Sequence, residues 1–230
     1  MLLLLATALL SPVVATQVIH ANDASSFRVA TVTDGLQHPW GMAFLPDGDL
    51  LITERRGRLL RLDPESGERT RIAGVPEVFS RNQGGLLDVA LHPEFGANRW
   101  VYLSYAATGD GGAATQVSRA RLNGDTLVDR EVLFRGTPYV SGGRHFGSRL
   151  AFDQDNHLYI TTGDRGQRHY AQDPGAHLGK VIRLTANGQI PQDNPFLDNP
   201  DAQPRLYTTG HRNPQGAAMH PATGQLWIHE

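Results

Sequence analysis

The sequence of 230 residues contains no cysteine. Disulfides, cysteine metal sites and thiol catalysis are therefore excluded. An excess of positive charge is also lacking, because the formal net charge is −2 at pH 7. Nucleic acids and anionic membrane surfaces both bind basic faces, so we expect neither as a partner.

Long hydrophobic runs and helical periodicity are scarce as well. The apolar run at residues 1–10 is shorter than the ~20 residues that a helix needs to cross a bilayer. It leads into the small-residue stretch 13–15, which resembles a signal-peptide cleavage site, although no Lys or Arg precedes the run. We therefore predict a signal peptide over residues 1–15, a periplasmic or secreted protein and no membrane insertion. The alternative is a buried N-terminal strand or helix.

What the chain does contain is a repeated strand pattern. It has 25 Gly and 14 Pro among 40% apolar residues, a balance that favours a core with many turns. In each repeat an alanine precedes a polar turn and then an alternating strand. These alanines are 47, 61 and 67 residues apart, so the longer intervals imply loop insertions into a propeller blade of about 40–50 residues. We predict an all-β fold, a β-propeller over residues 25–230, with a β-sandwich as the alternative. The repeats span 40–53, 87–105, 149–162 and 216–228, with marker residues Ala43, Ala90, Ala151 and Ala218.

The repeats raise a question of closure. Four of them account for the whole chain, so about four blades are present. A propeller closes when its last blade pairs with its first, and an open ring leaves an exposed edge. We therefore expect roughly two more blades beyond Glu230. We also expect the isolated chain to aggregate.

Two polar turns carry the candidate chemistry. His145 lies in the glycine-lined turn 142–147, and Arg212 and Asn213 lie in the turn 210–216. Each turn precedes a strand of the same type, and equivalent loops of a propeller deliver their side chains to one site. An imidazole titrates near neutral pH, which suits a general base, and a planar guanidinium suits a polarised oxygen. The alternatives are a loop salt bridge for Arg212 and a turn role for Asn213.

With these motifs placed, the chain resembles the soluble quinoprotein sugar dehydrogenases, also called the glucose/sorbosone dehydrogenase family. The matches run in the expected order from about Leu36 to Glu230 and are specific as a set. They comprise 83–87 before His92-Pro93, the turn around His145, and the segments 163–166, 179–184 and 210–216.

The resemblance implies a six-bladed propeller that binds pyrroloquinoline quinone (PQQ) and Ca²⁺. Such a protein oxidises the anomeric hydroxyl of an aldose to the lactone and passes electrons to an acceptor other than oxygen. It implies that His145 is the catalytic base, that Arg212 and Asn213 contact the quinone, and that Gln83 lies near sugar and quinone. His145, Arg212 and Gln83 would then also contact the substrate.

Some positions depart from this pattern or add little to it. Arg144 occupies a position where the glucose-specific branch has a carboxylate, which adds positive charge beside the base and fits the broader aldose branch. Asp164 is interpreted as a turn residue, and Gln215 as support for its turn. No carboxylate cluster suggests a Ca²⁺ site, which needs six to eight oxygens. The resemblance puts those ligands beyond Glu230.

Two other functions remain open from the residues. The first is a calcium-dependent propeller lactonase or hydrolase, which would need converging carboxylates where this chain offers His, Arg, Asn and Gln. The second is a non-catalytic extracellular propeller that binds sugar or protein.

Overall fold

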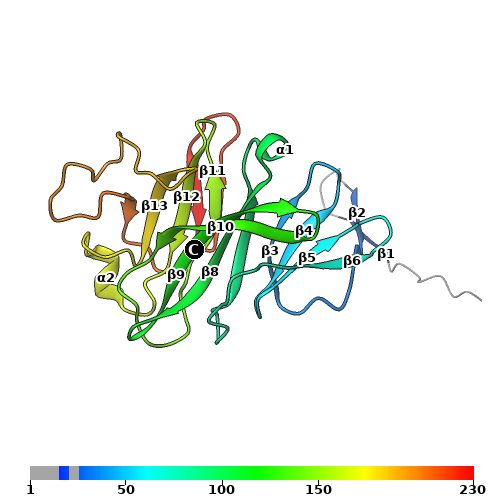
Figure 1. Ribbon diagram of the computed structural model, residues 1–230, viewed down its shortest axis with the longest axis horizontal. Coiled ribbons are helices and arrows are strands. Elements are labelled where there is room, and N and C mark those ends of the chain that lie inside the picture. Colours follow the sequence, from blue (N-terminus) through cyan, green and yellow to red (C-terminus); the bar gives the residue numbers. More distant parts are fainter. Residues whose placement is uncertain (1–15, 21–25) are drawn as a thin grey trace, which may run out of the picture.

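The computed structural model describes residues 16–20 and 26–230, so the predicted signal peptide lies outside the described residues. Antiparallel sheets of consecutive strands make up nearly all of the regular secondary structure of this part and lie side by side, as expected for propeller blades (Figure 1). No helix of the described part is long and apolar enough to cross a membrane. The predicted all-β propeller fold is confirmed.

Three sheets are complete blades of four strands in sequence order. Blade 1 consists of β3 (Pro39–Phe44), β4 (Leu50–Glu54), β5 (Arg58–Leu62) and β6 (Arg69–Ile72). Blade 2 consists of β7 (Leu86–Leu91), β8 (Trp100–Gly109), β9 (Gly112–Asn123) and β10 (Thr126–Arg135). Blade 3 consists of β11 (Leu150–Phe152), β12 (His157–Thr162), β13 (Lys180–Thr185) and β14 (Leu206–Thr209).

Shorter elements complete the described part. β15 (Gly216–Met219) and β16 (Leu226–His229) form a hairpin, as do β1 (Thr16–His20) and β2 (Ser26–Ala30). Two helices have a single turn each, α1 (Phe95–Asn98) and α2 (Arg168–Gln172). The four alanines of the repeat all lie on the first strand of a sheet, namely Ala43 on β3, Ala90 on β7, Ala151 on β11 and Ala218 on β15.

The apolar core lies between neighbouring blades. Alternate residues of a strand point to opposite faces, so each blade can pack against the one before and the one after. Leu51, Leu59 and Val101 are fully buried between blades 1 and 2. Tyr102 and Ile160 are fully buried between blades 2 and 3. This packing fixes the relative positions of the loops at the blade ends.

A buried carboxylate ties blade 2 to the start of blade 3. Asp88 on β7 accepts hydrogen bonds from the Leu150 backbone N–H at 2.8 Å and from Arg149 Nη1 at 2.9 Å. Burial raises the pKa of Asp88 to about 6, although the charge of Arg149 opposes the shift. The contact holds the start of β11 directly behind the loop that carries His145.

Candidate functional site

Three predicted site residues meet through the loop that precedes β11. Hydrogen bonds join the loops before β7, β11 and β15, so these loops lie together at one end of the blades. The Gln83 side chain accepts a hydrogen bond from the His145 backbone N–H, with Oε1 at 2.6 Å. Asn213 Oδ1 accepts one from the Gly147 N–H at 3.0 Å. Gln83 and Asn213 therefore hold the His145 loop from both neighbouring loops.

The imidazole of His145 is oriented by Asp164, which follows β12 in the same blade. His145 Nδ1 lies 2.7 Å from Asp164 Oδ1, and the aspartate is 2% exposed. Because an ionised carboxylate accepts hydrogen bonds and cannot donate them, Nδ1 carries the proton. Nε2 is then the ring nitrogen that can accept a proton from a substrate.

Close backbone packing explains the glycines around this pair. A Cβ atom on Gly163 would lie 2.1 Å from the carbonyl oxygen of His145, so a side chain at 163 would push the His145 loop away. His145 itself has a φ of 57°, in the left-handed region that L-residues rarely adopt. The loop conformation therefore depends on the contacts around it.

Asp164 also connects the loop that precedes β15. Its backbone N–H donates to the Arg212 carbonyl oxygen at 2.8 Å. The carboxylate of Glu230 accepts from the backbone N–H groups of Arg212 at 2.8 Å and Asn213 at 3.2 Å, and from His211 Nδ1 at 2.8 Å. These hydrogen bonds lower the pKa of Glu230 against the opposing effect of burial, which is the largest single influence on the group. The segment that presents Arg212 is thus held at several points.

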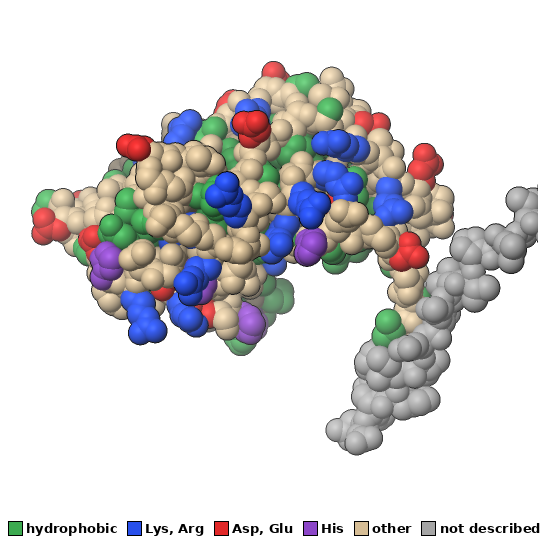
Figure 2. Space-filling model, turned by 90° about the horizontal axis from the view of Figure 1, so that it is seen from below, with side chains coloured by type: hydrophobic (Ala, Val, Ile, Leu, Met, Phe, Trp, Pro, Cys, Tyr) green, Lys and Arg blue, Asp and Glu red, His purple; other side chains and the backbone are tan. Residues whose placement is uncertain are grey.

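A cavity of about 460 Å³ opens beside Asp164. Arg168 and Arg212 supply its positive charge, and neither guanidinium has an ion-pair partner among the residues whose side chains are described. α2 lies at the lower left of Figure 1, and the view from below in Figure 2 shows Lys, Arg and His side chains on this face together with several Asp and Glu side chains. The cavity is lined by Asp164, Arg168, Ala171, Gln172, Gly210, His211 and Arg212.

The chemistry of this cavity fits an anionic planar ligand. Two guanidinium groups can bind carboxylate or carbonyl oxygens, and Asp164, the acidic group in the lining, is already engaged with His145. The donors of Arg168, Arg212 and Gln172 therefore suit the carboxylates and quinone oxygens of PQQ.

A metal site is less well supported. Within the described ranges, Asp153, Asp155 and His157 place one ligand atom each within 4.8 Å of one another. The Asp153 carboxylate is already occupied, because it accepts from the N–H groups of Asp155 and His157 and from the Tyr159 hydroxyl. Ca²⁺ needs six to eight oxygen ligands, so this trio is a turn in blade 3 and not a calcium site.

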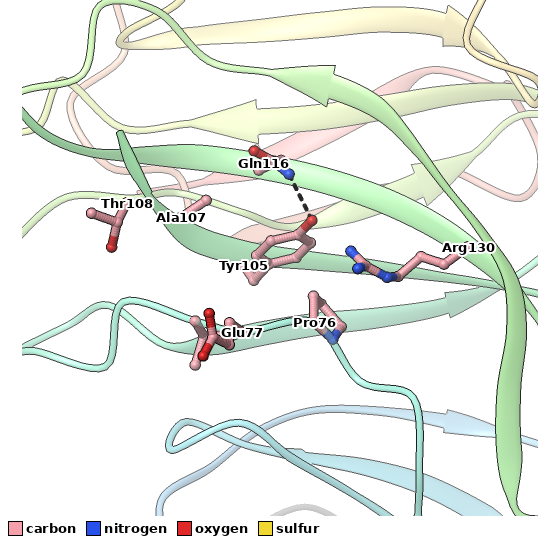
Figure 3. Close-up of a pocket in the computed structure, with 8 residues that line it drawn as sticks. Pro76, Glu77, Tyr105, Ala107, Thr108, Gln116 and Arg130 are labelled. Atoms are coloured by element: carbon pink, nitrogen blue, oxygen red, sulfur yellow. Dashed lines mark hydrogen bonds between the residues drawn. The ribbon is translucent and has the colours of Figure 1, made fainter. Parts of the chain in front are cut away.

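A second cavity, of about 470 Å³, lies away from this chemistry between the segment 76–78 and blade 2 (Figure 3). Tyr105 lies at its centre, where its hydroxyl accepts a hydrogen bond from Gln116 Nε2 at 2.8 Å. Glu77 and Arg130 approach it from different segments. It shares no lining residue with the His145 site, so we assign it no part in the chemistry.

The functional contact that the sequence interpretation missed is the one made by Asp164. Its predicted turn role is present, since Oδ1 accepts from the Gly166 N–H at 2.6 Å. The same oxygen also binds His145, and the interpretation as a turn residue did not include this. One signal was available: the end of β12 and the start of β11 are paired in an antiparallel hairpin, so Asp164 and His145 had to lie at the same end of blade 3.

Comparison with known proteins identifies the family of the chain. The sequence profile described as Glucose / Sorbosone dehydrogenase matches residues 36–230. Aldose sugar dehydrogenase of Escherichia coli is 43% identical over 210 residues, covering 90% of this chain and 57% of that protein. Quinoprotein glucose dehydrogenase B of Acinetobacter calcoaceticus is 30% identical, covering 86% of this chain and 47% of that protein.

Solved structures give the same result for the fold. The apo-form of the E. coli aldose sugar dehydrogenase is similar with a TM-score of 0.84, 41% identity and coverage of 94% of this chain and 60% of that chain. The PQQ-bound aldose sugar dehydrogenase of Streptomyces coelicolor is similar with a TM-score of 0.76 and 33% identity, and the match covers 93% of this chain and 59% of that chain. The chain spans about 57% of the length of the E. coli relative. With the profile match covering most of its residues, the chain belongs to the glucose/sorbosone dehydrogenase family.

Proposed function

We propose that this chain forms the proton-abstracting part of a PQQ-dependent aldose dehydrogenase. The observation that carries the proposal is the His145–Asp164 pair next to a cavity lined by Arg168 and Arg212. The reaction is the oxidation of the anomeric hydroxyl to a lactone. PQQ, when bound, supplies the acceptor for the hydride.

The residues of this chain abstract the proton, orient the base and bind the cofactor. His145 Nε2 accepts the proton of the anomeric hydroxyl, which lets the hydride leave the same carbon. Asp164 keeps the proton on Nδ1 and stabilises the imidazolium once it forms. Arg212 would hold an oxygen of the bound cofactor and supply positive charge there, and Gln83 and Asn213 hold the base in place.

Three further proposals accompany this one, two from the family resemblance and one from the N-terminal sequence. We propose that Ca²⁺ is the second cofactor and that residues other than the Asp153 trio bind it. We propose a periplasmic or secreted location from the apolar run at residues 1–10. The electron acceptor is a molecule other than oxygen.

The test is His145→Ala in the full-length protein supplied with PQQ, Ca²⁺, an aldose and a dye acceptor. Turnover should fall by about 10²–10⁴-fold, the range for loss of a general base. An absorbance titration of PQQ should show unchanged binding, because the imidazole is assigned to proton transfer. His220→Ala is the control, since His220 accepts hydrogen bonds in the turn between β15 and β16. Near-normal turnover of His145→Ala would contradict the assignment of His145 as the general base.

A further inference from the structure

The buried Arg165 contacts the His145 loop without touching its ring. Arg165 is 2% exposed and directly follows Asp164 in the turn after β12. It has no ion-pair partner among the residues whose side chains are described. A buried cation needs compensation, and here backbone carbonyls supply it.

The guanidinium of Arg165 donates hydrogen bonds to the chain segment that leads into His145. Nη2 donates to the carbonyl oxygens of Gly142 at 2.8 Å and Val140 at 3.5 Å, and Nη1 donates to that of Arg144. Nε donates to the carbonyl oxygen of Ala113 on β9 at 3.3 Å. All three nitrogens therefore bind main-chain oxygens, and most of these belong to the segment that ends at His145.

Two more contacts continue the same connection beyond His145. The backbone N–H of Arg165 donates to the His145 carbonyl oxygen at 3.2 Å. The carbon at the centre of the guanidinium lies 3.6 Å from the ring centroid of Phe146, which is a close cation–π contact. Arg165 thus contacts backbone or side chain on both sides of the candidate base.

We propose that Arg165 is the positioning residue for His145, clamping the backbone of its loop while the adjacent Asp164 orients its ring. This inference rests on the proposed function, since it gives the clamp a role in aldose oxidation. A lysine cannot replace the clamp, because an ammonium is a point charge and does not offer the planar fork of donors. Arg165 acts through His145 and has no contact with the reacting atoms.

The first experiment needs neither cofactor nor substrate. We compare hydrogen–deuterium exchange of the segment 142–149 in the wild-type protein, in Arg165→Lys and in the control Arg183→Lys. Arg183 is also a buried arginine of blade 3, but its ion pair is with Asp193 and it has no bond to the His145 loop. We expect exchange in 142–149 to rise about tenfold in Arg165→Lys and to stay unchanged in the control. Unchanged exchange in Arg165→Lys would overturn the clamp.

The second experiment measures the reaction in the full-length protein. In Arg165→Lys we expect kcat to fall about 10²-fold, as for a misplaced catalytic group, with little change in KM for the aldose. Guanidinium ion added at a low, non-denaturing concentration can replace the missing side-chain group of Arg165→Ala. It should therefore restore part of the turnover of Arg165→Ala and none of the turnover of His145→Ala. A normal kcat with raised exchange would show that the clamp does not serve the reaction.

The two experiments separate failure of the clamp from failure of the proposed function. If the wild-type protein does not oxidise aldoses while exchange responds to Arg165→Lys, the function is wrong and the structural clamp holds. If Arg165→Lys does not fold, Arg165→Gln retains an amide NH₂ donor group at this position and takes its place in both measurements.

Discussion

At the scale of single residues, the site depends on the carboxylate of Asp164, which makes two hydrogen bonds through one oxygen. Asp164 Oδ1 accepts from Gly166 N–H and from His145 Nδ1, so the turn and the contact with the candidate base depend on the same atom. The turn was predictable from the glycine and aspartate in sequence. The predicted strand pair also put Asp164 and His145 at the same end of a blade, but the sequence pattern did not reveal the left-handed backbone of His145 within its loop.

The prediction for this pair is made with Asp164→Asn. The amide can present its NH₂ group to Nδ1, which would move the ring proton to Nε2 and remove the basic site. We expect kcat to fall at least about 10²-fold with a smaller change in KM, because orientation and tautomer matter most in the transition state. Steady-state kinetics against Asp173→Asn, an exposed turn aspartate that accepts from Gly175 N–H, provides the check. Equal rates for both variants would remove Asp164 from the mechanism.

A second residue-scale prediction concerns pH and folding. Burial lowers the pKa of His177 from 6.5 to about 4, and its Nε2 has no partner among the described residues. Between these two values the unfolded chain binds a proton that the folded chain does not, so stability is lost as pH falls. From pH 7 to pH 5 this single group should cost about 2 kcal/mol.

The measurement is urea unfolding of the wild type and His177→Phe at both pH values. Phenylalanine keeps a ring against Phe134, where the imidazole now packs edge-on at 5.3 Å, but it does not titrate. The free energy of unfolding of the wild type should therefore fall by about 2 kcal/mol more than that of the variant. Parallel losses in the two proteins would show that His177 is not the group responsible.

At the scale of elements, the alternating pattern predicted the blades well. Residues 40–53 became β3 and β4, and every marker alanine lies on a first strand. The long strands β9 and β10 were not singled out, because their outer positions mix exposed and buried residues and give a weak alternation. The helices α1 and α2 have one turn each, which is too short for a helical period to show.

The sequence predicted which loops form the candidate site, but it did not predict the buried contacts that hold those loops. Residues that precede equivalent strands, such as Gln83, His145 and Asn213, could be grouped because a repeated fold superposes their loops. The buried Arg165 could not, since it acts through main-chain oxygens whose positions depend on the folded loop. Contacts to backbone leave no mark in the residue types of their partners.

At the scale of the whole molecule, the stacked sheets leave apolar side chains uncovered at both ends. Met42 and Phe44 on β3 are 61% and 66% exposed, and Trp227 on β16 is 63% exposed. Met42 and Phe44 are two residues apart and therefore share one face of blade 1, opposite to the face on which Ala43 joins the core with blade 2. Exposed apolar faces on sheets promote association.

We therefore expect the 230-residue chain to self-associate as its concentration rises. The measurement is sedimentation velocity over a concentration series, with the Phe44→Thr variant alongside. Threonine keeps the strand preference of β3 but removes most of the apolar area, so the variant should shift toward the monomer. Val32→Thr is the control, because Val32 is also an exposed apolar residue but lies outside the strands. If Val32→Thr reduces association as much as Phe44→Thr, general surface hydrophobicity and not the face of blade 1 drives it; a wild-type chain that stays monomeric throughout the series would contradict the prediction itself.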